Sequence, residues 1–190
     1  MYIKKTILIL CLILFSIGCG QAEKKEKKSE QKTNISNTVE NITKANQKNN
    51  GWFLNYEEVY QRSIKENKPI MANFTGSDWC GWCKKLKKAV FDTEVFKNWA
   101  EKNVILFELD YPRRTPQDPE IKKQNAELQQ TFRSLVRGYP TVLIFDIERS
   151  FDNNGGKNKD NIKIHGNRMG YMPDPDSFIN VANQNLQNRK

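Results

Sequence analysis

Two patterns of apolar and polar residues alternate along residues 51–190. Tyr56–Asn67 repeats apolar side chains at helical spacing, and Lys68-Pro69 follows, which predicts a helix that ends there. Pro69–Thr75 and Asn103–Asp110 are instead short, nearly continuous apolar runs, which are typical of buried strands. The region therefore begins with a helix and continues with strands.

The segment between these two strands has helical spacing. Cys83, Leu86 and Val90 fall on one face, and the pattern breaks near Asp92-Thr93 before it resumes. Two strands joined by a helix form a βαβ unit. We therefore expect the two strands to be parallel, with a right-handed connection.

The remaining residues predict a loop, two helices and two further strands. In chain order these are a loop at Tyr111–Pro119, a helix at Glu120–Arg133, strands at Pro140–Asp146 and Asn161–His165, and a helix at Asp174–Gln187. Asn153–Gly156 lies between the two strands and is typical of a hairpin connection. The order of elements, α-β-α-β-α-β-β-α, indicates an α/β fold.

The first residues have the layout of an export signal. Lys4-Lys5 precedes the apolar run Thr6–Phe15, which is too short to span a bilayer comfortably and leads to small residues before Cys19. A cysteine at this place resembles the lipobox of bacterial lipoproteins, although Ser16 stands where Leu is usual. We predict a lipoprotein-type signal peptide at 1–18 and acylation of Cys19. An ordinary secretory signal or a single anchor helix remain alternatives, and all three place the rest of the protein outside the cytoplasm.

Residues 19–50 carry the predicted acylated cysteine and a stretch rich in Lys and Asn without an aromatic residue. Such a stretch cannot bury enough apolar area to offset its conformational entropy, so we expect a disordered tether. With a length of 190 residues, the chain then has room for one domain, at 51–190.

Composition and charge exclude two broad classes. Hydrophobic residues make up 37% and charged residues 28% of the chain, too polar for a protein with many membrane spans. The net charge is +9, but 51–190 holds only 22 basic residues against 18 acidic ones. No stripe of Arg and aromatic residues accompanies this small excess, so we expect no nucleic-acid partner.

The four cysteines narrow the chemistry. Cys11 lies in the signal peptide and Cys19 at the lipid site, which leaves Cys80-Gly-Trp-Cys83 as an isolated C-x-x-C. Zinc would need two more ligands, yet the chain has a single histidine, His165, which we expect to be an ordinary strand residue. Haem attachment would need histidine where Lys84 stands. The remaining interpretation is that Cys80 and Cys83 form a redox-active dithiol. We expect no metal site.

Two separated motifs resemble the thioredoxin superfamily. Phe74–Lys85, with Trp directly before the C-x-x-C, is similar to the active-site stretch of exported thioredoxin-like proteins with an F-T-G-x-W-C-x-W-C core. Gly138–Thr141 is similar to the loop that carries the family's cis-proline before a strand. The resemblance covers about 51–188 and implies a thioredoxin fold: a central mixed sheet of about four strands with helices on both faces.

The resemblance also implies catalytic roles. Cys80, at the start of a helix, would be the attacking thiolate, and Cys83, one turn further and more buried, would release the product. No cofactor besides this disulfide is expected. The residues implied to contact substrate are Trp79, Gly81, Trp82, Tyr139 and Pro140. For Trp79 the alternative is that it merely covers the strand end, and for Trp82 we weigh substrate contact and a purely structural role evenly. For Tyr139, packing is the more frequent role of an aromatic residue before a strand.

This chain departs from thioredoxins at two places. Asn73 stands where thioredoxins commonly carry a buried acid that assists proton transfer, so that step would need water or another carboxylate. Gly81-Trp82 replaces the usual Gly-Pro, and this dipeptide tunes the balance between dithiol and disulfide. The direction of electron flow is therefore open, with the reductase direction favoured.

Three functions compete. The favoured one is a membrane-tethered thiol-disulfide oxidoreductase that acts on exported proteins, supplied by an upstream thiol donor and facing the periplasm. The second is a binding module on a thioredoxin scaffold with structural cysteines. The third uses Cys80 and Cys83 to hold a soft ion such as Cu(I).

Overall fold

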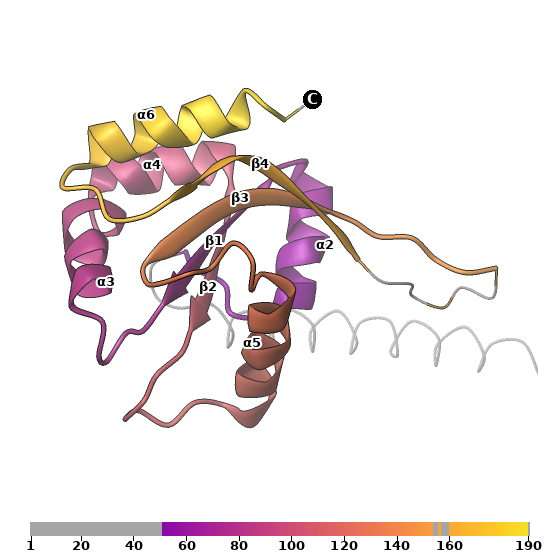
Figure 1. The fold of residues 1–190 in the computed structure, drawn as a ribbon. Coiled ribbons are helices and arrows are strands. Elements are labelled where there is room, and N and C mark those ends of the chain that lie inside the picture. Colours follow the sequence, from indigo (N-terminus) through magenta and orange to yellow (C-terminus); the bar gives the residue numbers. More distant parts are fainter. Residues whose placement is uncertain (1–50, 154–155, 157–159, 190) are drawn as a thin grey trace, which may run out of the picture. The chain divides into compact units, whose positions relative to one another are not determined.

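The computed structural model describes residues 51–153, 156 and 160–189, which lie within the compact unit Ala45–Lys190 (Figure 1). The expected signal peptide, Cys19 and the tether lie outside these described residues. The elements, in chain order, are α2 (Tyr56–Glu66), β1 (Ile70–Thr75), α3 (Gly81–Leu86), the π-helical turn η1 (Lys87–Phe91), α4 (Glu94–Asn103), β2 (Ile105–Asp110), α5 (Pro119–Thr131), β3 (Thr141–Glu148), β4 (Asn161–Met169) and α6 (Pro175–Leu186).

The four strands form one mixed sheet in the order β2-β1-β3-β4. β1 and β2 are parallel, which confirms the predicted βαβ pairing, and β3 runs antiparallel to both β1 and β4. β3 and β4, which match the strands predicted at 140–146 and 161–165, therefore form the expected hairpin. The arrangement is the thioredoxin fold that the resemblance implies.

Alternating side chains along the strands build two cores, one on each face of the sheet. In β1, Met71 points to the core that α3, α4 and α6 cover, while Ile70 and Phe74 point to the core under α2 and α5. Figure 1 shows α4 and α6 side by side on one face and α5 on the other. β1 and β2 are covered on both faces, which explains their continuous apolar sequences.

The helices begin at polar capping residues that the sequence supplies. Asn55 accepts a hydrogen bond from the Glu58 N–H at 3.0 Å, and Thr93 accepts one from the Phe96 N–H at 3.3 Å. The Thr93 cap explains the predicted break in the helical pattern, because it starts α4 as a separate helix. In the described part of the chain, no helix combines the length and the apolar character needed to cross a membrane.

Two elements differ from the prediction. β4 continues to Met169, past the expected end at His165, and its register with β3 shifts between Val142 and Ile144. The extension was hidden because β4 lies at the sheet edge and carries exposed polar residues there. The π-helical turn η1 was also not predicted from the periodicity.

Candidate active site

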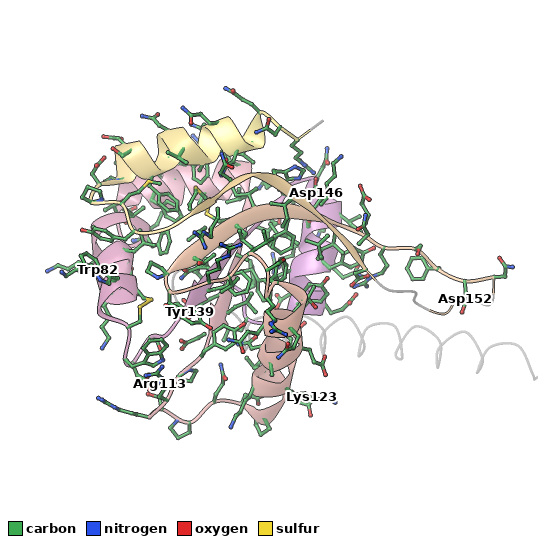
Figure 2. All side chains as sticks on the ribbon, viewed as in Figure 1. Trp82, Arg113, Lys123, Tyr139, Asp146 and Asp152 are labelled. Carbon is green, nitrogen blue, oxygen red and sulfur yellow. A yellow bond between two sulfur atoms is a disulfide. The ribbon has the colours of Figure 1, made fainter. Side chains whose placement is uncertain are left out.

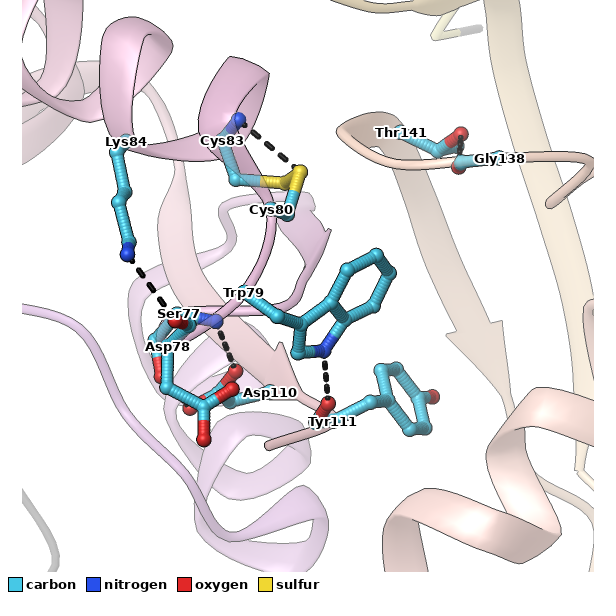
Figure 3. The surroundings of a disulfide bond; sticks show 10 residues. All are labelled: Ser77, Asp78, Trp79, Cys80, Cys83, Lys84, Asp110, Tyr111, Gly138 and Thr141. Atoms are coloured by element: carbon cyan, nitrogen blue, oxygen red, sulfur yellow. Dashed lines mark hydrogen bonds between the residues drawn. A yellow bond between two sulfur atoms is a disulfide. The ribbon is translucent and has the colours of Figure 1, made fainter. Parts of the chain in front are cut away.

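Cys80 and Cys83 form a disulfide at the start of α3, with their Cα atoms 5.3 Å apart (Figure 3). Cys80 is the N-cap of this helix, and its Sγ accepts a hydrogen bond from the Cys83 N–H at 3.2 Å. The first turn of α3 therefore directs a backbone donor at the sulfur of Cys80. A donor at this place favours the thiolate once the disulfide is reduced.

The two cysteines are almost equally covered in this oxidised form. Cys80 is 6% exposed and Cys83 is 5% exposed. The expected difference, with Cys83 clearly deeper, is therefore not seen. The reason is that the disulfide and the hydrogen bond from Cys83 N–H draw Cys80 Sγ over the first turn of the helix.

Two carboxylates tie the loop before Cys80 to the loop after β2. Asp110 accepts hydrogen bonds from Ser77, at 2.8 Å from its N–H and 2.5 Å from its hydroxyl. In the opposite direction, Asp78 accepts from the backbone N–H groups of Arg113, Arg114 and Thr115, the shortest at 2.6 Å. Desolvation alone would raise the pKa of Asp78, but these backbone donors lower it to about 2.

Trp79 is held by its neighbours on several sides. Its indole N–H donates to the Tyr111 carbonyl at 2.8 Å (Figure 3). The Arg113 guanidinium lies 3.8 Å from its ring centroid. The Tyr139 ring meets it edge-on at 5.6 Å. A Cβ on Gly76 would lie 2.3 Å from Trp79 Cε2, so only glycine leaves room for this ring. These contacts match the reading in which Trp79 covers the strand end.

Trp82 and Gly81 face outward beside the disulfide. Trp82 is 54% exposed and packs against Tyr171 with ring centroids 5.0 Å apart, and Lys85 Nζ lies 4.3 Å from its ring centroid. Figure 2 shows Trp82 at the edge of the molecule, pointing away from the sheet. Gly81 is exposed, with no atom within 4 Å of where its Cβ would be. Both residues therefore lie on exposed surface next to the disulfide.

The second motif lies across from the cysteines. The Tyr139–Pro140 peptide bond is cis, as the resemblance implies, and Thr141 donates from its hydroxyl to the Gly138 carbonyl at 2.7 Å. An open hollow of about 360 Å³ borders Pro140. The Tyr139 ring also packs against Tyr111, at 5.6 Å between centroids, and its burial raises its pKa. Tyr139 thus joins Trp79 in one aromatic cluster.

The lysines after the C-x-x-C mostly have partners away from the sulfurs. Lys84 Nζ donates to the Asp78 carbonyl at 3.1 Å, and Lys87 pairs with Asp92. Within the described ranges, no three His, Cys, Asp or Glu residues cluster so as to hold a metal ion. His165 is buried in β4, with Nε2 2.9 Å from Asp146 Oδ2.

A family model described as thioredoxin-like matches residues 48–146, more than half of the chain. The chain belongs to the thioredoxin-like family. It is 34% identical to "Disulfide bond reductase DsbH" of Chlamydia pneumoniae over 93 residues, which cover 49% of this chain and 55% of that protein. It is 28% identical to "Thioredoxin-related protein DsbJ" of the same organism over 138 residues, which cover 69% of this chain and 37% of that protein.

A solved structure, "DsbH Oxidoreductase", superimposes with a TM-score of 0.56 and 27% identity over 75% of this chain and 88% of that one. The chain spans about half or less of the length of the curated relatives it matches. The thioredoxin-like assignment thus rests on the family match and on a similar solved fold.

One group in this thioredoxin-like site was missed by sequence reasoning. Glu108 is only 7% exposed and lies beside Asn73, which is 6% exposed and occupies the place of the family's usual acid. Glu108 is the single charge inside the apolar run Val104–Leu109, and that interruption is the signal that could have identified it. Asp78 was also missed, because its partners follow more than thirty residues later.

Proposed function

We propose that this protein is a thiol-disulfide oxidoreductase that reduces disulfides in exported proteins. The observation that carries the proposal is the Cys80–Cys83 disulfide at the start of α3, in a chain whose cis-Pro140 loop has the family's sequence. The similarity to a protein named as a disulfide bond reductase supports the direction.

In the first step, the reduced enzyme attacks its substrate. The Cys80 thiolate forms a bond to one sulfur of the substrate disulfide, and the other sulfur leaves as a thiolate that takes a proton from solvent. The Cys83 N–H and the start of α3 favour the anionic form of Cys80. The product of this step is a mixed disulfide between Cys80 and the substrate.

In the second step, Cys83 attacks Cys80. The new bond restores the Cys80–Cys83 disulfide, and the second substrate sulfur leaves as a thiol. The substrate has then gained two electrons and two protons from the enzyme dithiol. An upstream thiol donor must reduce the enzyme disulfide before the next cycle.

The surface around the disulfide supplies the substrate contacts. An extended segment would lie along the Pro140 loop, with the exposed Trp82 beside it and Gly81 leaving room for its backbone. Trp79 and Tyr139 are partly buried and pack edge-on against each other beside this surface. The open hollow next to Pro140 is consistent with an extended polypeptide rather than a small molecule.

The N-terminal sequence features support a location of this activity outside the cytoplasm. We propose that the signal peptide 1–18 directs export, that Cys19 receives the lipid and that 19–50 tethers the domain on the periplasmic side of a membrane. Cys19→Ser should abolish incorporation of a labelled fatty acid into the full chain expressed in a bacterial host. Cys11→Ser is the matched control, and incorporation that survives Cys19→Ser would rule out lipidation at this residue.

Reduction of insulin disulfides by the full chain, with dithiothreitol as donor, tests the enzymatic proposal. Cys80→Ser should lower the rate to that of the donor alone, because no nucleophile remains. Cys83→Ser, reduced and then freed of dithiothreitol before insulin is added, should instead accumulate a mixed disulfide with insulin, visible by non-reducing electrophoresis. If Cys80→Ser still reduces insulin, or if the wild type does not, the protein is not this kind of enzyme and the binding-module reading gains support.

A further inference from the structure

A small, partly open cavity lies behind the disulfide, between the sheet and the start of α3. Its volume is about 80 Å³, and its lining includes Cys83, Asn73 and Glu108. A cavity needs only about 10–15 Å³ to hold a water molecule if polar groups line it. This cavity is therefore large enough for water between Cys83 and the sheet.

The pairing of β1 with β2 brings the side chains of Asn73 and Glu108 to the same face of the sheet. They are direct partners in the parallel register of β1 and β2. Along each strand they lie two residues from Met71 and Leu106, which point into the core under α3, α4 and α6. Because successive side chains alternate between faces, Asn73 and Glu108 point to the face that carries Cys83.

Asn73 contributes an unsatisfied oxygen to this cavity. Its Oδ1 is buried and lacks a hydrogen-bond partner among the described residues. Buried polar atoms nearly always have a partner, from the protein or from ordered water. An amide oxygen of this kind holds a water molecule in place but cannot take a proton from a thiol.

Among the described residues that line the cavity, Glu108 is the one carboxylate. The other titratable or charged groups that face it are Cys83 and Lys84 from α3 and Lys87 from η1, while β1 adds only uncharged side chains. Lys84 is bound to the Asp78 carbonyl and Lys87 to Asp92. Glu108 is therefore the one carboxylate base among the described residues that line the cavity with Cys83.

We propose that Glu108 accepts the proton of the Cys83 thiol in the release step, through water in this cavity. The proposal rests on the oxidoreductase function proposed above. The proton moves from Cys83 Sγ to the Glu108 carboxylate, and the Cys83 thiolate then bonds to Cys80 Sγ while the bond between Cys80 and the substrate breaks. The substrate sulfur leaves with the electron pair and receives a proton from Glu108 or from solvent.

A single-turnover reaction with 5,5′-dithiobis(2-nitrobenzoic acid) separates the two steps, using the reduced full chain with Cys11→Ser and Cys19→Ser so that Cys80 and Cys83 hold its only thiols. The first thionitrobenzoate reports attack by Cys80, and the second reports release by Cys83. Glu108→Gln should leave the first phase within about twofold and slow the second about a hundredfold near neutral pH, the lower end of the effect of general-base catalysis. Glu127→Gln, an exposed glutamate on α5, is the matched control and should change neither phase.

The pH dependence distinguishes a proton acceptor from a structural residue. Without Glu108 the thiol must ionise by itself, so the second phase of Glu108→Gln should rise about tenfold per pH unit up to the ordinary thiol pKa of about 8.5. The defect should then nearly vanish above that pH. In the double variant Asn73→Asp with Glu108→Gln, a carboxylate on the facing strand position should restore most of the second phase.

Two results would overturn the inference. One is a second phase that Glu108→Gln leaves unchanged near neutral pH, and the other is a defect that is equal at all pH values and not rescued by Asn73→Asp. If the wild type itself releases no thionitrobenzoate and Cys80→Ser behaves identically, the proposed function has failed instead.

Discussion

At the scale of single residues, buried or bound carboxylates organise this site more than ion pairs do. Asp78 and Asp110 each bind backbone or hydroxyl donors of the other's loop. A carboxylate that accepts several backbone N–H groups fixes a loop without the entropy cost of ordering two long side chains. The position of Trp79, next to Asp78, depends on these two residues.

We expect Asp78→Asn to destabilise the protein at neutral pH. The folded pKa of Asp78, about 2, lies below the ordinary value of about 3.9. A lowered folded pKa means that the stabilisation is present above the unfolded pKa and is lost as the pH falls through the folded pKa. The difference in Tm between wild type and Asp78→Asn should be constant above about pH 5 and should shrink between about pH 4 and pH 2.

Thermal unfolding followed by circular dichroism across this pH range measures that difference. Glu101→Gln, an exposed carboxylate on α4, serves as control and should show no such convergence. If Asp78→Asn unfolded at the wild-type temperature at pH 7, the backbone hydrogen bonds to Asp78 would contribute nothing to the fold.

At the scale of elements, the junction of β1 and α3 depends on Gly76. A methyl group there would overlap the Trp79 ring, so Gly76→Ala must displace the indole from its bond to the Tyr111 carbonyl. Steric overpacking of this kind typically costs about 1–3 kcal/mol. We expect Gly76→Ala to unfold at lower urea concentration and to reduce insulin more slowly.

Gly81→Ala is the matched control for stability. It lies at the start of α3 with open space around it, and alanine favours a helix over glycine by about 0.5–1 kcal/mol. Urea unfolding monitored by tryptophan fluorescence should therefore show unchanged or higher stability for Gly81→Ala. If Gly76→Ala and Gly81→Ala lost equal stability to urea, the overlap with the Trp79 ring would not be what destabilises Gly76→Ala.

The elements differ in how much the sequence alone reveals. β1 and β2 are covered on both faces, so their apolar runs predict them well. β4 lies at the sheet edge, and the exposed polar residues after His165 give no apolar pattern that would predict its last residues as strand. The residues that flank η1, Leu86 and Asp92, have right-handed helical φ and ψ angles, so η1 continues a helical path and apolar spacing does not distinguish it from an α-helix.

At the scale of the whole molecule, predictability follows distance along the chain. The cysteines and Trp79 are neighbours in one motif, so the sequence identifies them together. Glu108 reaches Cys83 only because β2 pairs with β1 in a particular register, which no local pattern specifies. The charge of Glu108 within an apolar run is visible in the sequence, but its place in the same cavity as Cys83 becomes visible only in the folded sheet.

The direction of electron flow is also a property of the whole site. A dithiol becomes a stronger oxidant when its thiolate is stabilised. Here Cys80 has one backbone donor at 3.2 Å, while Lys84 and Lys87 point their ammonium groups at other partners. These features favour a low potential, near the ~−270 mV of thioredoxin rather than the ~−120 mV of DsbA.

Equilibration of the full chain with defined ratios of reduced and oxidised dithiothreitol, followed by alkylation and mass spectrometry, measures this potential. A gap of about 150 mV corresponds to about 10⁵ in the equilibrium constant, so the two outcomes are well separated. Lys84→Ala should leave the value nearly unchanged, because its ammonium group binds the Asp78 carbonyl rather than the sulfur. A potential near that of a strong oxidant would keep the dithiol chemistry but make the protein form disulfides, and its upstream partner would then have to be an electron acceptor.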